Sequence, residues 1–104
     1  MPVSQVIRLQ AAPGRFNDLL VRSEQLGKIR ARLAPECKTR RFVPTSGTVA
    51  GTLVVVLEFP NARALGEYQD RLSDDPEARA LQEKARGERE PILISQTIEY
   101  VREL

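Results

Sequence analysis

The sequence predicts an α+β protein in which one antiparallel sheet of four strands carries helices on one of its faces. One observation behind this prediction is the order of hydrophobic periods, which is strand, helix, strand, strand, helix and strand. The other is the run LVVVL at residues 53–57, the one uninterrupted stretch of large apolar residues in a chain of 104 residues. Bounded by Gly51 and Pro60, this run indicates a strand buried on both faces.

The first half of the chain predicts a strand, a helix and a weaker strand. Residues 3–10 show a mostly alternating apolar pattern, which indicates the first strand. Residues 15–33 carry an apolar stripe with a period close to 3.6, and Pro35 ends the helix that this stripe predicts. Gly27 inside that helix costs about 1 kcal/mol relative to Ala, which suggests close packing there. Residues 37–45 form a weaker strand at an edge of the sheet.

The second half predicts the central strand, a broken helix and a last strand. The central strand follows its predecessor after a short turn, so the two are expected to be antiparallel neighbours. Asn61 is a favourable N-cap, and Asp75 followed by Pro76 restarts the helix after a break. The resulting β-α-β-β-α-β order is the ferredoxin-like arrangement. The expected ranges are 62–72 and 76–87 for the helical segments and 92–101 for the last strand.

Composition fits one globular domain over residues 1–104, with 41% apolar and 29% charged residues. The net charge of +2 is too small to indicate a nucleic-acid partner unless it gathers on one face. The N-terminal residues show no secretory signal, so we expect a cytoplasmic location without membrane association.

Several kinds of chemistry are excluded by residue content, because the chain has no histidine, no tryptophan and only one cysteine, Cys37. One chain therefore cannot assemble a zinc site of the usual nitrogen and sulfur type, a haem site with a proximal histidine, or a Ser-His-Asp relay. We expect no metal and no cofactor. A single cysteine also excludes an internal disulfide and favours a reducing compartment.

Alternation along the central strand gives its two faces different characters. The odd-numbered positions are the more apolar, so we assign them to the side that the helices cover, and the even-numbered positions to the opposite side. The helix-facing set is Val49, Leu53, Val55, Leu57 and Phe59, and the opposite set is Thr48, Thr52, Val54, Val56 and Glu58.

The face away from the helices is mixed, too apolar for a solvated sheet and too charged for a dry core. No further element remains in the sequence to cover it, so we expect a homodimer whose two sheets pack face to face around a partly polar cavity. Ile94 and Ile98 are assigned to the core. The other strands would bring to the uncovered face Val6, Arg8, Gln10, Ser95, Thr97, Glu99 and Val101.

Two stretches of the chain have a distinctive order of features. In VIRLQAAPGRFNDLL an arginine-bearing strand leads into Pro-Gly and a long helix. In GTLVVVLEFPNARALGEYQDRLSDDPEAR an apolar strand leads into a helix that ends at Asp-Pro-Glu. In both stretches the chain resembles NIPSNAP-like proteins of the dimeric α/β-barrel superfamily. The resemblance implies a dimeric α/β barrel and no agreed catalytic residues. The superfamily also includes cofactor-independent monooxygenases, haem-degrading oxygenases, polyketide cyclases and isomerases.

Two functions follow from these expectations. The first is a homodimeric barrel that binds a small apolar or amphipathic molecule between its sheets. The second is a cofactor-independent enzyme, a monooxygenase, polyketide cyclase or isomerase, with an acid-base set in a low-dielectric cavity. Alternatively, Arg8 forms structural ion pairs with Glu58 or Glu99, within one chain or across the dimer. The candidate ligand-binding residues are Arg8, Glu58, Thr97 and Glu99.

Other reactive residues have a structural interpretation beside a functional one. Tyr68 and Tyr100 are expected in the core rather than as phenol donors. Cys37 lacks a histidine to activate it, although nearby cations could lower its pKa, so we expect a small structural residue. Pro2 would be an N-terminal general base if Met1 were removed, as in tautomerases, whose strands are parallel.

A cluster of basic residues surrounds the end of the first helix and the second strand. Its structural interpretation is a solvated face that complements the helix dipole, and its functional one is a site for an anion or RNA. RNA-binding sheets of this topology present stacking aromatics, and Phe42 is the only phenylalanine among these basic residues. The cluster consists of Arg30, Arg32, Lys38, Arg40 and Arg41.

Overall fold

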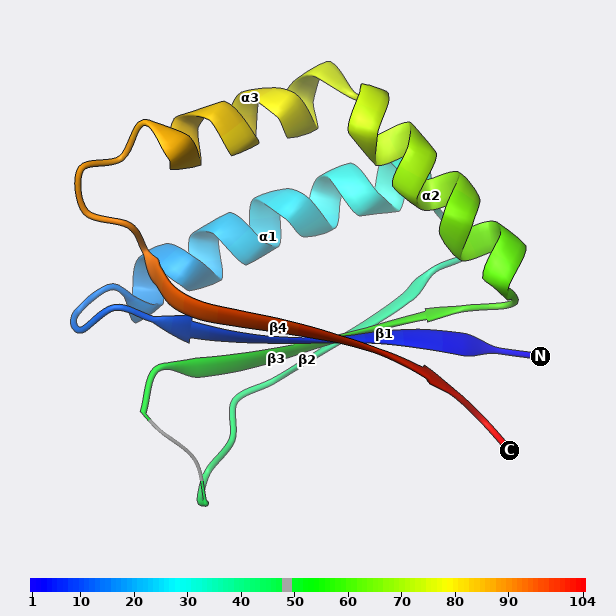
Figure 1. Cartoon of the computed structure of the whole chain (residues 1–104), viewed down its shortest axis with the longest axis horizontal. Helices are drawn as coiled ribbons and strands as arrows, with labels where there is room; N and C mark the ends of the chain where they lie inside the picture. The colour runs from blue at the N-terminus through cyan, green and yellow to red at the C-terminus, as the bar shows by residue number, and fades with distance from the viewer. Residues whose placement is uncertain (48–49) are drawn as a thin grey trace.

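The computed structural model describes residues 1–47 and 50–104. Four strands form one antiparallel sheet, and three helices lie on one side of it (Figure 1). The predicted β-α-β-β-α-β order is confirmed, with the second helix broken in two. The elements are β1 (Val3–Ala11), α1 (Phe16–Leu33), β2 (Lys38–Phe42), β3 (Thr52–Phe59), α2 (Ala62–Asp74), α3 (Pro76–Arg86) and β4 (Leu93–Arg102). The sheet order is β2-β3-β1-β4.

The predicted division of β3 into two faces is confirmed where the structure describes it. Leu53, Val55, Leu57 and Phe59 are each at most 4% exposed, and they form the core with side chains from α1 and α2. The Phe59 ring lies 5.5 Å from the ring of Tyr68 on α2, centroid to centroid. Thr48 and Val49, which the prediction also placed on these faces, lie outside the described residues.

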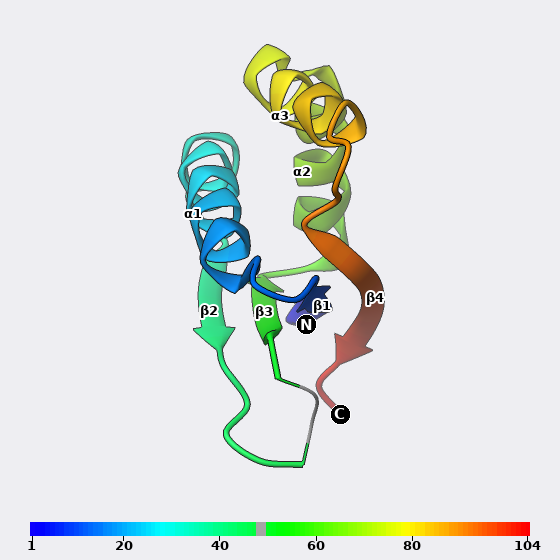
Figure 2. The same cartoon turned by 90° about the vertical axis from the view of Figure 1, so that its left-hand side faces the viewer.

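The helices cover the middle of the sheet more fully than its edges. Seen from the side in Figure 2, all three helices stand over one face. All five residues of β2 are exposed, and every residue of β4 after Leu93 is exposed. β2 is also shorter than the predicted 37–45, and it remains the antiparallel neighbour of β3.

The assignment of Ile94 and Ile98 to the core is wrong. Ile94 is 59% exposed and Ile98 is 44% exposed. Ile98 is paired with Ile7 and so lies on the helix side, but β4 is an edge strand and no helix packs closely over it. Ile94 lies where the register shifts between Gln10 and Ala11, so the simple alternation of the strand does not extend to it.

The helix break works as the sequence predicted. Asn61 caps α2 by accepting a hydrogen bond from the Ala64 N–H at 2.8 Å. Asp75 caps α3 in the same way, accepting from the Ala78 N–H at 3.0 Å, and Pro76 occupies the first turn. Both oxygens of the Asp75 carboxylate also lie 2.9 Å from the Arg32 guanidinium, which ties the break to α1.

Hydrogen bonds from Arg32 and from the Ala78 N–H hold the pKa of the Asp75 carboxyl below its ordinary value. A lowered folded pKa means that the carboxylate stabilises the fold at neutral pH, and that this contribution is lost as the pH falls through the folded pKa. We expect the wild-type melting temperature to drop below about pH 4 more steeply than that of Asp75→Asn.

Asp75→Asn keeps a capping oxygen and removes the charge, so it should melt below wild type at pH 7 and converge with it in acid. Thermal melts followed by circular dichroism from pH 7 to pH 2 measure both curves. Asp70→Asn, at an exposed position on α2, is the control and should follow wild type. Parallel curves for Asp75→Asn and wild type would contradict the assignment.

Candidate functional site

An apolar cavity lies between the helices and β4. Its volume is about 490 Å³, and α1, α2, α3 and β4 all contribute to its lining. A second hollow of about 140 Å³ lies deeper, between α1 and the sheet, and shares Arg22, Leu26, Leu93 and Gln96 with the first. The apolar residues around the outer cavity are Leu26, Leu72, Ala78, Leu81, Ala85 and Leu93.

Polar groups occur at a few points of this cavity. The Arg22 guanidinium lies at the junction of the two hollows and forms an ion pair with Glu88 at 2.6 Å. Gln96 of β4 also lines both hollows, and Arg30 lines the deep one. A mostly apolar cavity with a few polar groups is the usual construction of a small-molecule site.

The sequence did not predict this cavity. The available signal was the thin apolar stripe of α3, which consists of Ala78, Leu81 and Ala85. Two alanines in such a stripe fill little of the space between a helix and its neighbours. The stripe alone does not show that β4 lies across from it.

The predicted ligand-binding residues lie on the face away from the helices, as expected, but only three of them are neighbours. Arg8 is paired with Thr97 across β1 and β4. Glu99 is paired with Val6, which places it diagonally from Arg8 at about 7–8 Å.

Glu58 lies apart from this group. It is paired with Ser4, four residues along β1 from Arg8, so roughly 13 Å separates the two backbone positions. Its carboxylate lies 4.0 Å from the Arg40 guanidinium of β2 instead. Among the described residues, Arg8 forms no ion pair with Glu58 or Glu99. An acid-base set of Arg8, Glu58 and Glu99 is therefore not assembled within one chain.

The basic cluster does not form one surface. Arg32 is paired with Asp75 and Glu77. The register of β2 places Lys38 and Arg40 on the face away from the helices and Arg41 on the opposite one. The interpretation of the whole cluster as a solvated face is wrong for Arg30, which is only 8% exposed.

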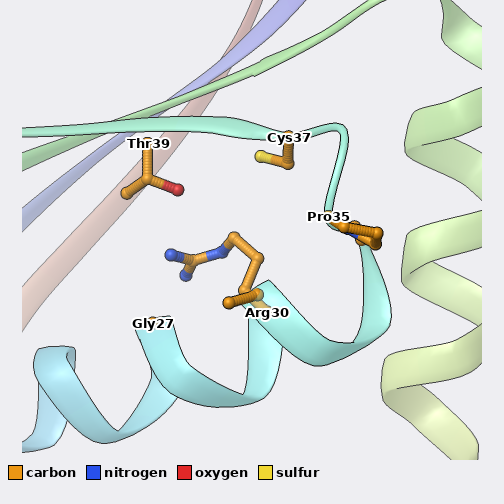
Figure 3. Close-up of a pocket in the computed structure, with 7 residues that line it drawn as sticks. Gly27, Arg30, Pro35, Cys37 and Thr39 are labelled. Atoms are coloured by element: carbon orange, nitrogen blue, oxygen red, sulfur yellow. The ribbon is translucent and has the colours of Figure 1, made fainter.

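Arg30 borders a groove between α1 and β2. Figure 3 shows its guanidinium between Gly27 on α1 and Thr39 on β2, with Cys37 beside it. The groove has a volume of about 370 Å³. The Arg30 Nε–H donates a hydrogen bond to the Tyr68 hydroxyl at 3.3 Å.

The two tyrosines differ in their surroundings. Tyr68 is 4% exposed and lies in the core as predicted. The same prediction for Tyr100 is wrong, because Tyr100 is 61% exposed on the edge strand β4. Its hydroxyl accepts hydrogen bonds from the side-chain amides of Gln69 at 3.3 Å and Gln5 at 3.5 Å.

Cys37 is not an activated thiol. Burial raises the pKa of the Cys37 thiol, and a hydrogen bond from Thr39 and the charge of Arg30 offset this only in part. The positive charges of Lys38 and Arg40 do not bring this pKa below its ordinary value. A raised pKa means little thiolate at neutral pH, so a nucleophilic role is not supported.

The remaining candidates gain no support. Pro2 is exposed before β1, and every strand pairing among the described residues is antiparallel, whereas the tautomerase interpretation needs a parallel pair. Within residues 1–47 and 50–104, no three Cys, Asp or Glu side chains gather as a metal site would require. None of the described helices is long and apolar enough to cross a membrane.

Sheet order, helix placement and element order together define an α+β protein with a ferredoxin-like fold. No family model matches the sequence, and no curated protein matches it.

Solved structures are similar to the chain over nearly its whole length. An uncharacterized NIPSNAP domain protein from Burkholderia xenovorans matches with a TM-score of 0.76 and 16% identity, over 98% of this chain and 94% of that one. A NIPSNAP family protein from Agrobacterium tumefaciens matches with a TM-score of 0.79 and 13% identity, over 98% and 92%. A putative antibiotic biosynthesis monooxygenase from Chloroflexus aurantiacus matches with a TM-score of 0.68 and 9% identity, over 100% and 94%. The ferredoxin-like fold of the single chain, which the NIPSNAP-like resemblance implied, is confirmed, and its pairing into a dimeric barrel stays a prediction.

The environment of Cys37 predicts slow alkylation. The thiolate is the nucleophile, so the rate of reaction with iodoacetamide should rise with pH through a midpoint above the ordinary thiol value. Arg30→Met removes a charge that favours the thiolate and should move the midpoint higher still. Arg89→Gln, an exposed position, is the control. Mass spectrometry at a series of pH values measures the rates, and a midpoint that falls in Arg30→Met would contradict the assignment.

Proposed function

We propose that this protein is a homodimer that binds a small apolar or amphipathic molecule, and that the molecule lies between the helices and the sheet of each protomer. The observation that carries the proposal is the apolar cavity of about 490 Å³ with its continuation of about 140 Å³ beneath α1. The outer cavity alone falls within the size range of small-molecule sites.

The chemistry of the lining supports this class of ligand. Apolar side chains from three helices and β4 surround the volume, which favours a hydrocarbon or aromatic body. The Arg22 guanidinium is already paired with Glu88, so it supplies polarity without an uncompensated charge. Gln96 offers an amide to a polar end of the ligand.

This placement differs from the one expected from the sequence, which put the ligand between two sheets. On the helix side of a single chain, a cavity of about 490 Å³ is already formed without a second copy. The alternative function as a cofactor-independent enzyme depended on the convergence of Arg8, Glu58 and Glu99, and the register keeps Glu58 apart within a chain.

A second copy of the chain is the partner that fits the face away from the helices. Val6 and Val56 at its centre are half-buried, and none of the described helices lies over them. Arg8 and Glu99 on the same face are both exposed, so a two-fold axis could bring the arginine of one protomer to the glutamate of the other. Covering these valines with an identical surface removes apolar area from water on both protomers.

The cavity is tested by filling it. Ala85→Trp places an indole in the lining of the outer cavity, while Ala80→Trp places the same indole at an exposed position of α3. We expect binding of the neutral dye N-phenyl-1-naphthylamine, measured by its fluorescence, to weaken about tenfold or more in Ala85→Trp, or roughly 1.4 kcal/mol. It should be unchanged in Ala80→Trp. No binding to wild type, or equal binding to both variants, would contradict the proposal.

The dimer is tested at the centre of the sheet. Wild type should sediment at twice the 11.7 kDa of the chain at micromolar concentration. Val56→Glu buries a carboxylate in the interface, and we expect this to weaken dimerisation by roughly 3 kcal/mol, on the order of 100-fold in Kd. Val21→Glu, at a 56% exposed position on α1, is the matched control and should remain a dimer. A monomeric wild type in analytical ultracentrifugation would refute the dimer and leave the cavity to be judged by dye binding.

A further inference from the structure

The groove between α1 and β2 has the features of a second site. It is open because β2 is an edge strand that the helix layer does not close over. The β2 residues on the helix side are Thr39 and Arg41, since they are paired with the core residues Leu57 and Val55. An adjoining hollow of about 320 Å³ shares Gly27, Arg30, Ala31 and Thr39 with the groove and adds Ser23, Glu24, Lys28 and Arg41.

The charge of Arg30 is not balanced by the protein. Among the described residues, Arg30 forms no ion pair, and its one hydrogen bond joins Nε to the neutral Tyr68 hydroxyl. Seven more exposed arginines contrast with it, because each lies within 4.0 Å of a carboxylate: Arg15, Arg22, Arg32, Arg40, Arg63, Arg71 and Arg79. The most buried arginine is therefore one without an acidic partner.

Among the described residues no fully buried side-chain nitrogen lacks a hydrogen-bond partner, so the unbonded terminal nitrogens of Arg30 reach solvent. Because the residue as a whole is only 8% exposed, water screens this charge less than it screens a surface arginine, and an anion that reaches it is bound more strongly. The terminal guanidinium nitrogens of Arg30 face the groove in Figure 3. Two parallel N–H groups of a guanidinium match two oxygens of a carboxylate or phosphate. Lys28 and Arg41 at the outer hollow add positive charge, and Glu24 is the single acidic residue that lines it.

Gly27 is a second, independent feature of the same groove. A glycine inside a helix is destabilising by about 1 kcal/mol relative to alanine. The sequence suggested close packing as the reason, but a Cβ built at Gly27 meets no protein atom within 4 Å. The described chain therefore offers no packing reason for glycine here. Its bare backbone leaves free space along the groove opposite Thr39.

We propose that the groove between α1 and β2 is an oxyanion site, in which Arg30 binds a carboxylate or phosphate group that lies against Gly27 and Thr39. The groove shares Arg30 with the deep hollow of about 140 Å³ but shares no lining residue with the outer apolar cavity, and the site does not depend on the function proposed for that cavity. Arg30 supplies the paired donors. The Thr39 hydroxyl, which donates to the Cys37 thiol, can turn to donate to a ligand oxygen instead. Arg41 and Lys28 attract the anion at the mouth of the groove.

Cys37 provides the measurement, because it lines the groove and is the only cysteine in the chain. An anion held by Arg30 shields the thiol and disfavours its thiolate, so inorganic phosphate or acetate should slow alkylation by iodoacetamide severalfold and saturably. Ionic strength is held constant with sodium chloride. A stronger effect of phosphate assigns a phosphate group to the site, and a stronger effect of acetate assigns a carboxylate. If neither phosphate nor acetate slows alkylation more than chloride does, the proposal is overturned.

Variants place the effect at the groove. Arg30→Gln should abolish the slowing, and Arg89→Gln should retain it fully. Thr39→Val is a second variant, because Thr39 lies at an exposed strand position whereas Arg30 is buried. It should weaken the slowing of alkylation by the anion, and it tests the site even if Arg30→Gln does not fold. Gly27→Ala should raise the melting temperature in the absence of phosphate, and it should reduce the slowing of Cys37 alkylation by phosphate. Retention of the full response in both Thr39→Val and Gly27→Ala would overturn the placement of the anion.

Discussion

The packing of one face of β3 against α1 and α2 is the constraint on which the rest of the structure depends. Leu53, Leu57 and Phe59 are almost completely buried there, and the tilted contact between the Phe59 and Tyr68 rings packs α2 against the sheet. Burial of such side chains contributes about 1.5–3 kcal/mol each. Burial of this face fixes the positions of α1 and α2 over the sheet. The parts of the sheet that these helices do not cover stay open.

Those remaining surfaces hold the cavity and the groove to which the proposals refer. Near β4, α3 follows the helix break with a thin apolar stripe of Ala78, Leu81 and Ala85. An apolar cavity remains between this stripe and the neighbouring elements. Toward β2, α1 stands over an exposed edge strand, and a polar groove is left between them. The Tyr68 hydroxyl links core and groove, because it holds Arg30 from the buried side. The helix layer therefore leaves an apolar cavity and a charged groove by covering the sheet incompletely.

A shared fold does not assign a function to this chain. The structures that match it include uncharacterized NIPSNAP domain proteins and a putative monooxygenase, all at 17% identity or less. One scaffold that hosts different activities places its specificity in side chains along cavities and edges. In this chain the proposed sites lie along the α3 cavity and the Arg30 groove.

The sequence by itself determined the order of elements, the two faces of β3 and the caps at Asn61 and Asp75, because these depend on period and on residues a few positions apart. Only the tertiary structure decided which surfaces are buried. Ile98 and Tyr100 have the pattern of core residues, but they lie on an edge strand that the helices leave largely exposed.

Register is equally non-local. It separates Glu58 from Arg8 although both have the parity of one face. Arg30 was assigned to a solvated basic cluster, yet the placement of α2 buries it against Tyr68. The physical reason is the same in each case: exposure and neighbours are set by strands and helices that meet from distant parts of the chain, and no local pattern encodes how far a helix layer extends over a sheet.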